Sequence, residues 1–172
     1  MNYAEHIRVI EGFPSPEISF KDISTLIAKP EVFKAAIKDM AKIVNDWGCD
    51  YVAGPESRGF VIGVPVAVEA GKGFIMARKP GKLPGKTISK SFTLEYAKAT
   101  LELPEFTVQP GKKYVLVDDL MATGGTIAAL KELIEECGGI VTGILTLIEL
   151  EDLNGRAALK GTPYASLVKY PH

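Results

Sequence analysis

The sequence has few cysteines and histidines and no long uninterrupted apolar run. Its two cysteines, Cys49 and Cys137, form no CxxC pair, so we expect free thiols in a reducing compartment rather than a disulfide. Its two histidines, His6 and His172, lie near the ends of the chain, and no His/Cys/Glu cluster indicates zinc. The first residues carry charges where a signal peptide would be apolar, and no run is long enough for a membrane span. We therefore expect a cytoplasmic protein without a membrane segment.

The sequence also lacks an excess of charge of either sign. Its formal net charge is -1, and its isoelectric point is about 6.2. A protein dedicated to nucleic acids or to membrane surfaces would show a basic field, so neither partner is expected, whereas one small anionic ligand remains compatible. The chain has 172 residues, 47% of them hydrophobic, and we expect a single domain over 1–172 with a substantial core.

Apolar runs and amphipathic stretches alternate through most of the chain. The helix expected over 30–47 has Pro30 at its first position, one apolar face and Gly48 as its stop. The expected strands are near-continuous apolar runs, so we predict an α/β fold with a central, mostly parallel, twisted sheet flanked by helices. Ligands of such sheets bind beyond the carboxyl ends of the strands. The other expected helices cover 60–71 and 126–139, and the expected strands cover 51–53, 73–79, 112–120, 140–150 and 165–170.

Three segments lie outside this alternation. Residues 1–28 are short and irregular, contain two closely spaced prolines, and predict an extended loop or a small N-terminal hood. Residues 80–92 are rich in glycine, proline and lysine without apolar periodicity, and they predict a long mobile lid loop. Residues 93–106 predict a hairpin-like pair of short strands.

The stretch YVLVDDLMATGGTIAAL, residues 114–130, predicts a ligand site. Two adjacent glycines let the backbone approach a ligand, and the start of the following helix favours an anion, with two threonine hydroxyls as further donors. Two aspartates would repel phosphate, but they fit the cis hydroxyls of a ribose or a hydrated Mg²⁺. The phosphate-binding loop and the aspartate pair together indicate a ribose 5-phosphate. The alternative is an ordinary turn after a strand, with solvated aspartates and a threonine that caps the next helix. The residues concerned are Asp118, Asp119, Thr123, Gly124, Gly125 and Thr126.

The motif VLVDDLMATGGT resembles the phosphoribosyl-pyrophosphate (PRPP) binding motif of the type I phosphoribosyltransferases. Four further segments, FKDIS, GPESRGFVIG, RKPGKLPGKT and LEYAKATLEL, fall in the order and spacing seen in the adenine phosphoribosyltransferases of that family. The resemblance runs essentially from end to end. It implies the type I phosphoribosyltransferase fold and a reaction in which adenine and PRPP, with Mg²⁺, give AMP and pyrophosphate. It also implies a homodimer.

The resemblance implies three groups of PRPP contacts. Asp118 and Asp119 bind the ribose hydroxyls, directly or through water, and help to stabilise positive charge that develops on the sugar. The Ser57–Arg58 peptide, often cis in the family, faces the pyrophosphate, and Arg58 binds that group through its guanidinium. Mg²⁺ is held mainly by PRPP and water, with no direct protein ligand. The remaining contacts are Ala122, Thr123, Gly124, Gly125 and Thr126 for the 5-phosphate, and Arg78, Lys79 and Lys82 for the pyrophosphate.

The resemblance implies that the hood carries the specificity for adenine. Phe20 stacks on the purine, and the main chain around Ser19 and Lys21 reads the edge that distinguishes a 6-amino purine from a 6-oxo purine. Many members have an apolar residue in place of Ser19 and arginine in place of Lys21, and main-chain readout tolerates both changes. Glu95 lies near the reacting base as the candidate that accepts its proton, and Tyr96 beside it is a further adenine contact.

Each of these roles has a simpler alternative. Phe20 could only pack the hood onto the domain, Glu95 could be a solvated strand-edge residue, and Arg58 could be a surface arginine in a turn. One of the basic lid residues is implied to act across the dimer interface, whereas for Lys86 and Lys90 we favour an ordinary solvated loop.

Three other functions fit the sequence less well. GKLPGKT imitates a Walker A loop, but only three residues separate its glycines where that motif needs four, which argues against a nucleoside triphosphatase or a kinase. A phosphoribosyltransferase for another base keeps the fold, and FKDIS and LEY argue against it. A non-enzymatic regulator that binds PRPP or purines would usually add a helix-turn-helix segment or a basic face, and neither is evident.

Overall fold

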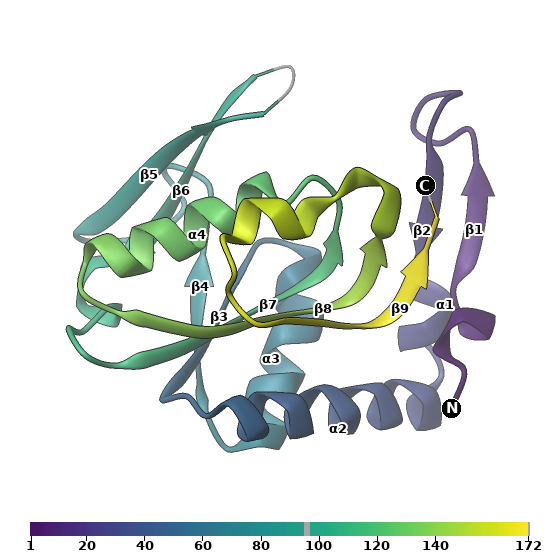
Figure 1. Cartoon of the computed structure of the whole chain (residues 1–172), viewed down its shortest axis with the longest axis horizontal. Coiled ribbons are helices and arrows are strands. Elements are labelled where there is room, and N and C mark those ends of the chain that lie inside the picture. The colour runs from purple at the N-terminus through teal and green to yellow at the C-terminus, as the bar shows by residue number, and fades with distance from the viewer. Residues whose placement is uncertain (95–96, 172) are drawn as a thin grey trace.

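The computed structural model describes residues 1–94 and 97–171, and its centre is a five-stranded sheet (Figure 1). The strands lie in the order β4-β3-β7-β8-β9, and every neighbouring pair is parallel. The predicted mostly parallel α/β sheet is therefore confirmed. The bounds are β3 Tyr51–Pro55, β4 Gly73–Ala77, β7 Lys113–Met121, β8 Ile140–Leu150 and β9 Tyr164–Tyr170.

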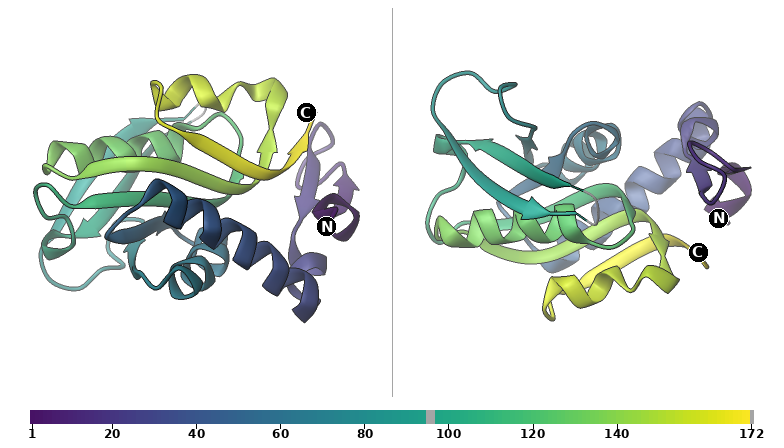
Figure 2. Two further views of the ribbon diagram at one scale, coloured as in Figure 1. Left: turned by 60° about the horizontal axis from the view of Figure 1, so that its bottom comes forward. Right: turned by 90° about the horizontal axis from the view of Figure 1, so that it is seen from above.

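Three long helices cover the two faces of the sheet (Figures 1 and 2). Helices α2 (Pro30–Trp47) and α3 (Arg58–Ala70) share one apolar core with Val115, Val117 and their neighbours, while α4 (Gly125–Glu136) packs in a second core on the opposite face. Pro30 opens α2, and Gly48 ends it with a positive φ of 73°, as the sequence predicts. No helix in the described parts of the chain is both long enough and apolar enough to cross a membrane.

The N-terminal hood is more regular than predicted. Strands β1 (Arg8–Glu11) and β2 (Ser19–Asp22) form an antiparallel hairpin, flanked by the 3₁₀ turn η1 (Tyr3–His6) and the short helix α1 (Ser24–Ile27). The expectation of an irregular loop was wrong because these strands are only four residues long. Strand β1 is largely exposed and β2 is half-buried throughout, so neither shows a clear apolar alternation in the sequence.

The segment predicted as a loop over 80–92 is also partly a strand. Strand β5 (Thr87–Thr93) pairs antiparallel with β6 (Lys98–Pro104) through seven residue pairs, so only the first part of the predicted loop lacks regular structure. The strand pair expected within 93–106 was wrong in its first strand. That strand is β5, which ends at Thr93, and only the second strand, β6, lies within the expected range. Lys90 was wrongly predicted as a solvated loop residue, because its ammonium pairs with Glu136 and, at 3.5 Å, with Glu132 on α4.

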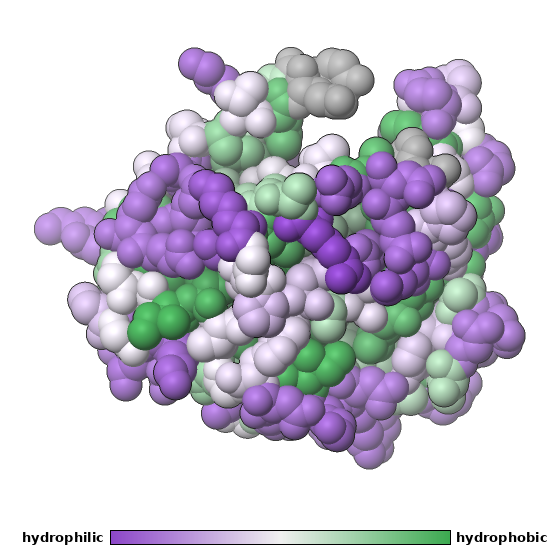
Figure 3. Space-filling view, viewed as in Figure 1, coloured by the Kyte–Doolittle hydropathy of each residue, from purple (hydrophilic) through white to green (hydrophobic). Residues whose placement is uncertain are grey.

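The hairpins β1–β2 and β5–β6 project from the same side of the molecule, toward which the strands of the central sheet also point (Figure 1). The view from above in Figure 2 places them at opposite ends of the sheet. The surface between them is hollowed in the space-filling view (Figure 3). The fold therefore puts a recess at the carboxyl end of the sheet, where parallel sheets bind their ligands.

Candidate active site

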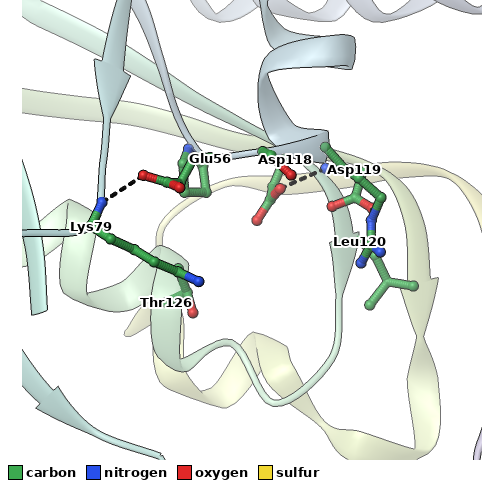
Figure 4. A pocket seen from close by; sticks show the side chains of 9 residues that line it. Glu56, Lys79, Asp118, Asp119, Leu120 and Thr126 are labelled. Atoms are coloured by element: carbon green, nitrogen blue, oxygen red, sulfur yellow. Dashed lines mark hydrogen bonds and ion pairs between the residues drawn. The ribbon is translucent and has the colours of Figure 1, made fainter. Parts of the chain in front are cut away.

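A pocket of about 350 Å³ opens where the ends of β3 and β7 meet the first residues of α3 and α4 (Figure 4). The two strands are neighbours in the sheet, so their carboxyl ends reach this place together. A second pocket of about 110 Å³ adjoins it and shares Asp118, Leu120 and Thr126 with it. Six residues predicted from the sequence line the first pocket: Ser57, Arg58, Lys79, Asp118, Asp119 and Thr126. The second adds the four others of the predicted phosphate loop: Ala122, Thr123, Gly124 and Gly125.

Two helix N-termini converge on these pockets. Helix α3 begins at Arg58 after Ser57, and α4 begins at Gly125 after Gly124, which has a positive φ of 84°. Neither N-cap residue makes a side-chain hydrogen bond to its helix, so the free N–H groups of the first turns remain available to a ligand. The positive ends of two helix dipoles favour an anion here.

Asp119 and Arg58 form an ion pair at the floor of the first pocket. Arg58 Nε donates to Asp119 Oδ2 at 2.7 Å, and Asp119 is buried, with 8% of its surface exposed. The Arg58 side chain is 54% exposed, so its remaining N–H donors face the pocket and solvent. Arg58 is therefore held in place by one donor while others stay available to bind a phosphate group.

Asp118 differs from its neighbour because no cation is paired with it directly. Its Oδ1 accepts the backbone N–H of Asp119 at 2.8 Å. Burial, followed by the adjacent Asp119 carboxyl group, raises the pKa of Asp118 well above its ordinary value, and the more distant Arg58 only partly offsets this. Asp118 therefore has one backbone donor and no paired cation, and a ligand hydroxyl can supply a further donor.

Glu56 is a site residue that the sequence analysis missed. Its carboxylate accepts the backbone N–H of Lys79 at 2.7 Å, Lys82 Nζ at 3.0 Å and Arg78 Nε at 3.3 Å. Burial alone would raise the pKa of Glu56, but these three donors outweigh burial and hold the pKa below its usual value. An acidic residue inside the predicted pyrophosphate turn PESRGF was a usable signal, since it needs cations around it.

Glu56 thereby connects the first strand turn to the base of the lid. It places the three predicted basic residues Arg78, Lys79 and Lys82 around one carboxylate. Figure 4 shows that the Lys79 side chain extends across the pocket toward Thr126 at the start of α4. Lys79 and the loop predicted for the 5-phosphate therefore face the same space, whereas Arg78 and Lys82 pair with Glu56 and line neither pocket.

The hood contributes a third, more apolar pocket of about 230 Å³, which Phe20, Lys21 and Arg58 help to line. The Arg58 guanidinium lies over the Phe20 ring, 5.5 Å from its centroid, so one arginine borders both the hood pocket and the main pocket. Lys21 Nζ lies 5.0 Å from the centroid of the Tyr170 ring and donates to Ser19 Oγ at 2.7 Å. The predicted base-binding residues of the hood are therefore next to the predicted PRPP residues.

Among the described residues, the non-proline cis peptide bond is Glu56–Ser57, one residue before the predicted Ser57–Arg58, so that prediction was wrong in position. Glu95 and Tyr96, predicted near the base, lie outside the described residues. Within the described residues, no group of three or more His, Cys, Asp or Glu side chains could hold a metal ion.

Comparison with known proteins identifies the family. Residues 22–166 match the phosphoribosyl transferase domain. The chain is 51% identical to an adenine phosphoribosyltransferase of Clostridium perfringens over 170 residues, which cover 99% of each chain. The chain belongs to the phosphoribosyltransferase family and, within it, to the adenine phosphoribosyltransferases.

Solved structures agree with this membership. The adenine phosphoribosyltransferase of Thermoanaerobacter pseudethanolicus superposes with a TM-score of 0.93 at 44% identity, covering 96% of both chains. The Saccharomyces cerevisiae enzyme, solved with an imino-altritol bisphosphate and adenine, superposes with a TM-score of 0.88 at 32% identity, covering 96% of this chain and 98% of the other. The predicted type I phosphoribosyltransferase fold is confirmed.

Proposed function

We propose that this chain transfers the 5-phosphoribosyl group of PRPP to N9 of adenine, giving AMP and pyrophosphate in purine salvage. One observation carries the proposal: two helix N-termini and a pair of aspartates converge on one pocket that basic residues border. Such a pocket suits a ligand with a phosphate at each end and a diol between them. We further propose that residues 1–172 act as one domain, because both apolar cores are built on the same sheet.

PRPP would lie across both pockets. Its 5-phosphate would take the free N–H groups at the start of α4 and the hydroxyls of Thr123 and Thr126. Its ribose hydroxyls would donate to Asp118 and Asp119, which adds donors to the single backbone N–H that Asp118 already accepts. Its pyrophosphate would take the start of α3 at Ser57 and the N–H donors of Arg58 that Asp119 leaves free. Arg78, Lys79 and Lys82, gathered around Glu56, would surround the same group.

Mg²⁺ fits this site as a companion of PRPP. Asp119 is already paired with Arg58, and within residues 1–94 and 97–171 no cluster of His, Cys, Asp or Glu offers three ligands to a metal ion. Asp118 and Asp119 would reach the ion through the ribose hydroxyls and water, which suits an ion that keeps several waters. When bound, Mg²⁺ supplies positive charge that neutralises the pyrophosphate.

Adenine would enter the hood pocket. The yeast relative, crystallised with adenine and a bisphosphate, supports a base site next to a phosphate site. Phe20 offers an apolar ring face, and β2 pairs only with β1 among the described residues, so one edge of β2 leaves backbone groups for the base. A carbonyl and an N–H from this edge would favour a 6-amino purine over a 6-oxo purine. Glu95 and Tyr96 stay predictions for the other side of the base.

In the proposed reaction, C1′ loses pyrophosphate while N9 of adenine bonds to the opposite face, and the N9 proton leaves to a base, for which Glu95 is the candidate. Asp118 and Asp119 stabilise positive charge on the ribose ring, and Arg58 and the lysines stabilise the departing pyrophosphate. The hairpin β5–β6 stands over the same side of the molecule and could exclude water that would hydrolyse PRPP (Figure 1).

The first test is a panel of bases. The purified protein with PRPP and Mg²⁺ should release pyrophosphate when adenine is added, and hypoxanthine, guanine and xanthine should support less than about 1% of that rate, since mismatched buried hydrogen-bonding groups cost several kcal/mol. Turnover with a 6-oxo purine would contradict the role given to the hood. Tight PRPP binding without turnover for any base would instead favour a regulator.

We also propose that the chain forms a homodimer through the face of α3 and the edge strand β4. Apolar side chains on this face are unusually exposed, and Phe60 on α3 packs edge-on against Phe74 of β4, so the two elements form one surface. Contiguous exposed apolar residues mark interaction sites, and a second copy is the partner that the family resemblance implies. The exposed side chains are Val64 and Val68 on α3 and Met76 on β4, and Phe106 of the 3₁₀ turn η2 (Glu105–Thr107), which shares a small pocket with Phe74, extends this surface.

Replacing Val64 with aspartate tests this dimer. Val64 is 40% exposed, and a charge at this position should disfavour association, so the mass measured by light scattering should fall from two chains to one. Ile18→Asp is the matched control, because Ile18 is 39% exposed but lies in the hood. A wild-type monomer, or a Val64→Asp variant that stays dimeric, would contradict the proposal.

A cytoplasmic location is proposed on the state of the cysteines. Cys49 is buried, Cys137 is partly buried, and both thiols are free, which confirms the sequence prediction of unpaired cysteines. Free thiols suit a reducing compartment.

A further inference from the structure

Glu149, near the end of β8, is a buried carboxylate with strong partners outside the pockets. Arg156 donates two parallel hydrogen bonds to it, Nε to Oε1 at 2.5 Å and Nη2 to Oε2 at 2.7 Å. Ser166 Oγ on β9 donates a third hydrogen bond to Oε2 at 3.0 Å. Only 4% of the Glu149 surface is exposed. A bidentate arginine–carboxylate pair has one preferred geometry, so it fixes the position of Arg156 relative to the sheet.

The arginine is held by a further contact on its other side. Its guanidinium lies over the Tyr164 ring, 4.8 Å from the centroid, and the Tyr164 hydroxyl is 2.6 Å from Oγ1 of the fully buried Thr146. Arg156 belongs to the 3₁₀ turn η4 (Gly155–Leu159), which leaves the sheet after the turn η3 (Glu151–Leu153). The segment that carries Arg156 is therefore anchored to β8 and β9.

This anchored turn touches the phosphate loop, backbone against backbone. A Cβ atom added to Gly155 would lie 2.4 Å from the carbonyl oxygen of Ala122, and one added to Gly124 would lie 2.6 Å from the carbonyl oxygen of Gly155. Both distances are far below van der Waals contact, so neither position has room for a side chain. The loop before α4 therefore has η4 directly behind it, with no flexible side chain between them.

We propose that Glu149 and Arg156 are positioning residues for the 5-phosphate: their ion pair holds η4 against the loop at 122–124 and so aims the N–H groups at the start of α4. The proposal rests on the 5-phosphate site assigned under the proposed function. Neither residue lines the two pockets of the PRPP site, so their action is exerted through Gly155. Binding of an anion by backbone donors depends on their direction, and an error of about 1 Å in position weakens it strongly.

The experiment compares two ligands that separate the ends of the site. Ribose 5-phosphate carries the phosphate that the α4 loop would bind, and inorganic pyrophosphate carries the other group. Titration calorimetry of Arg156→Met should show about 10-fold weaker ribose 5-phosphate binding with unchanged pyrophosphate binding. Arg156→Lys keeps the charge but loses the two parallel hydrogen bonds. Its affinity for ribose 5-phosphate should lie between those of wild type and Arg156→Met.

A second route to the same result protects against a misfolded variant. Gly155→Ala leaves the ion pair intact but inserts a Cβ against the Ala122 carbonyl, and it should also weaken ribose 5-phosphate selectively. Lys42→Met is the control, because it removes a cation from an exposed pair with Asp46 on α2. It should change the affinity for neither ribose 5-phosphate nor pyrophosphate.

The variant Thr126→Val distinguishes the 5-phosphate site itself from the positioning role of the Glu149–Arg156 pair. If Thr126→Val weakens ribose 5-phosphate but Arg156→Met and Gly155→Ala do not, the phosphate site stands and the positioning role is wrong. If none of the three variants changes ribose 5-phosphate binding, the assignment of the 5-phosphate to this loop is itself wrong. Equal losses for both ligands in Arg156→Met would show a general structural role and would also overturn the proposal.

Discussion

Replacing Arg58 with methionine is expected to lower kcat/KM for PRPP about 100- to 1,000-fold, the cost of removing a well-placed charge-stabilising donor. In the proposed complex, the guanidinium binds the departing pyrophosphate with the donors that Asp119 leaves free. The same substitution leaves the buried Asp119 carboxylate without its partner at 2.7 Å. Both effects act on the transition state, since pyrophosphate gains charge as it leaves and the ribose depends on Asp119.

The measurement combines steady-state kinetics with product inhibition by pyrophosphate. Arg58→Lys should recover only part of the loss, because an ammonium cannot bind Asp119 and a phosphate in the same forked geometry. Arg8→Met is a closely matched control: Arg8 pairs with Asp22 at 2.8 Å, and its side chain is 61% exposed, against 54% for Arg58. If the inhibition constant of pyrophosphate for the Arg58→Met variant lies within threefold of the wild-type value, Arg58 is not a pyrophosphate ligand.

Replacing Asp118 with asparagine is expected to lower kcat/KM about 100-fold and, at neutral pH, to raise the thermal midpoint. Asparagine keeps the shape and the acceptor oxygen that the Asp119 N–H uses, so the fold loses no bond. It removes a charge that burial and the adjacent Asp119 disfavour. The site thus keeps a destabilising carboxylate because the ribose hydroxyls need an acceptor.

The sign of the pH dependence follows from the raised pKa of Asp118. Below the pKa of an unfolded aspartate, about 3.9, the group is protonated in both states and costs the fold nothing. As pH rises from there through the higher folded pKa, the unfolded chain releases its proton more readily, and stability is lost. The advantage of Asp118→Asn should therefore be small near pH 4 and grow toward neutral pH.

Differential scanning calorimetry between pH 4 and 8 checks this expectation. Asp119→Asn is the matched control with the opposite sign, because that carboxylate is paired with Arg58 and its loss should lower the midpoint at neutral pH. An Asp118→Asn variant that is less stable than wild type at pH 7 would show that Asp118 is not a strained charge in the folded protein.

The sheet and the phosphate loop were predictable because their signals are local. The run from Tyr114 to Val117 is fully buried, as its unbroken apolar character predicts, and the Gly124–Gly125 pair lies at the start of α4, where the chain adopts a positive φ. These features depend on residues within one turn or one strand of each other. Periodicity and turn chemistry therefore suffice to place them.

The role of Glu56 was not predictable in the same way. Its partners Lys79 and Lys82 lie 23 and 26 residues further along the chain, and only the pairing of β3 with β4 brings them together. Strand β5 escaped prediction for another reason: its residues alternate between partly buried and exposed without a buried apolar face, and its pairing with β6 is carried by the backbone. A pattern read from side chains does not detect such a ribbon.

The ribbon β5–β6 changes how the lid would respond to substrate. A coil over the pocket would lose its conformational freedom each time a ligand ordered it, at about 1–2 kcal/mol for each residue fixed. Here seven residue pairs are already aligned between the two strands, so most of that entropy is lost when the chain folds. If the proposed lid closes over PRPP, more of the binding free energy is left to show as affinity, because a preformed ribbon is displaced and no loose chain has to be ordered.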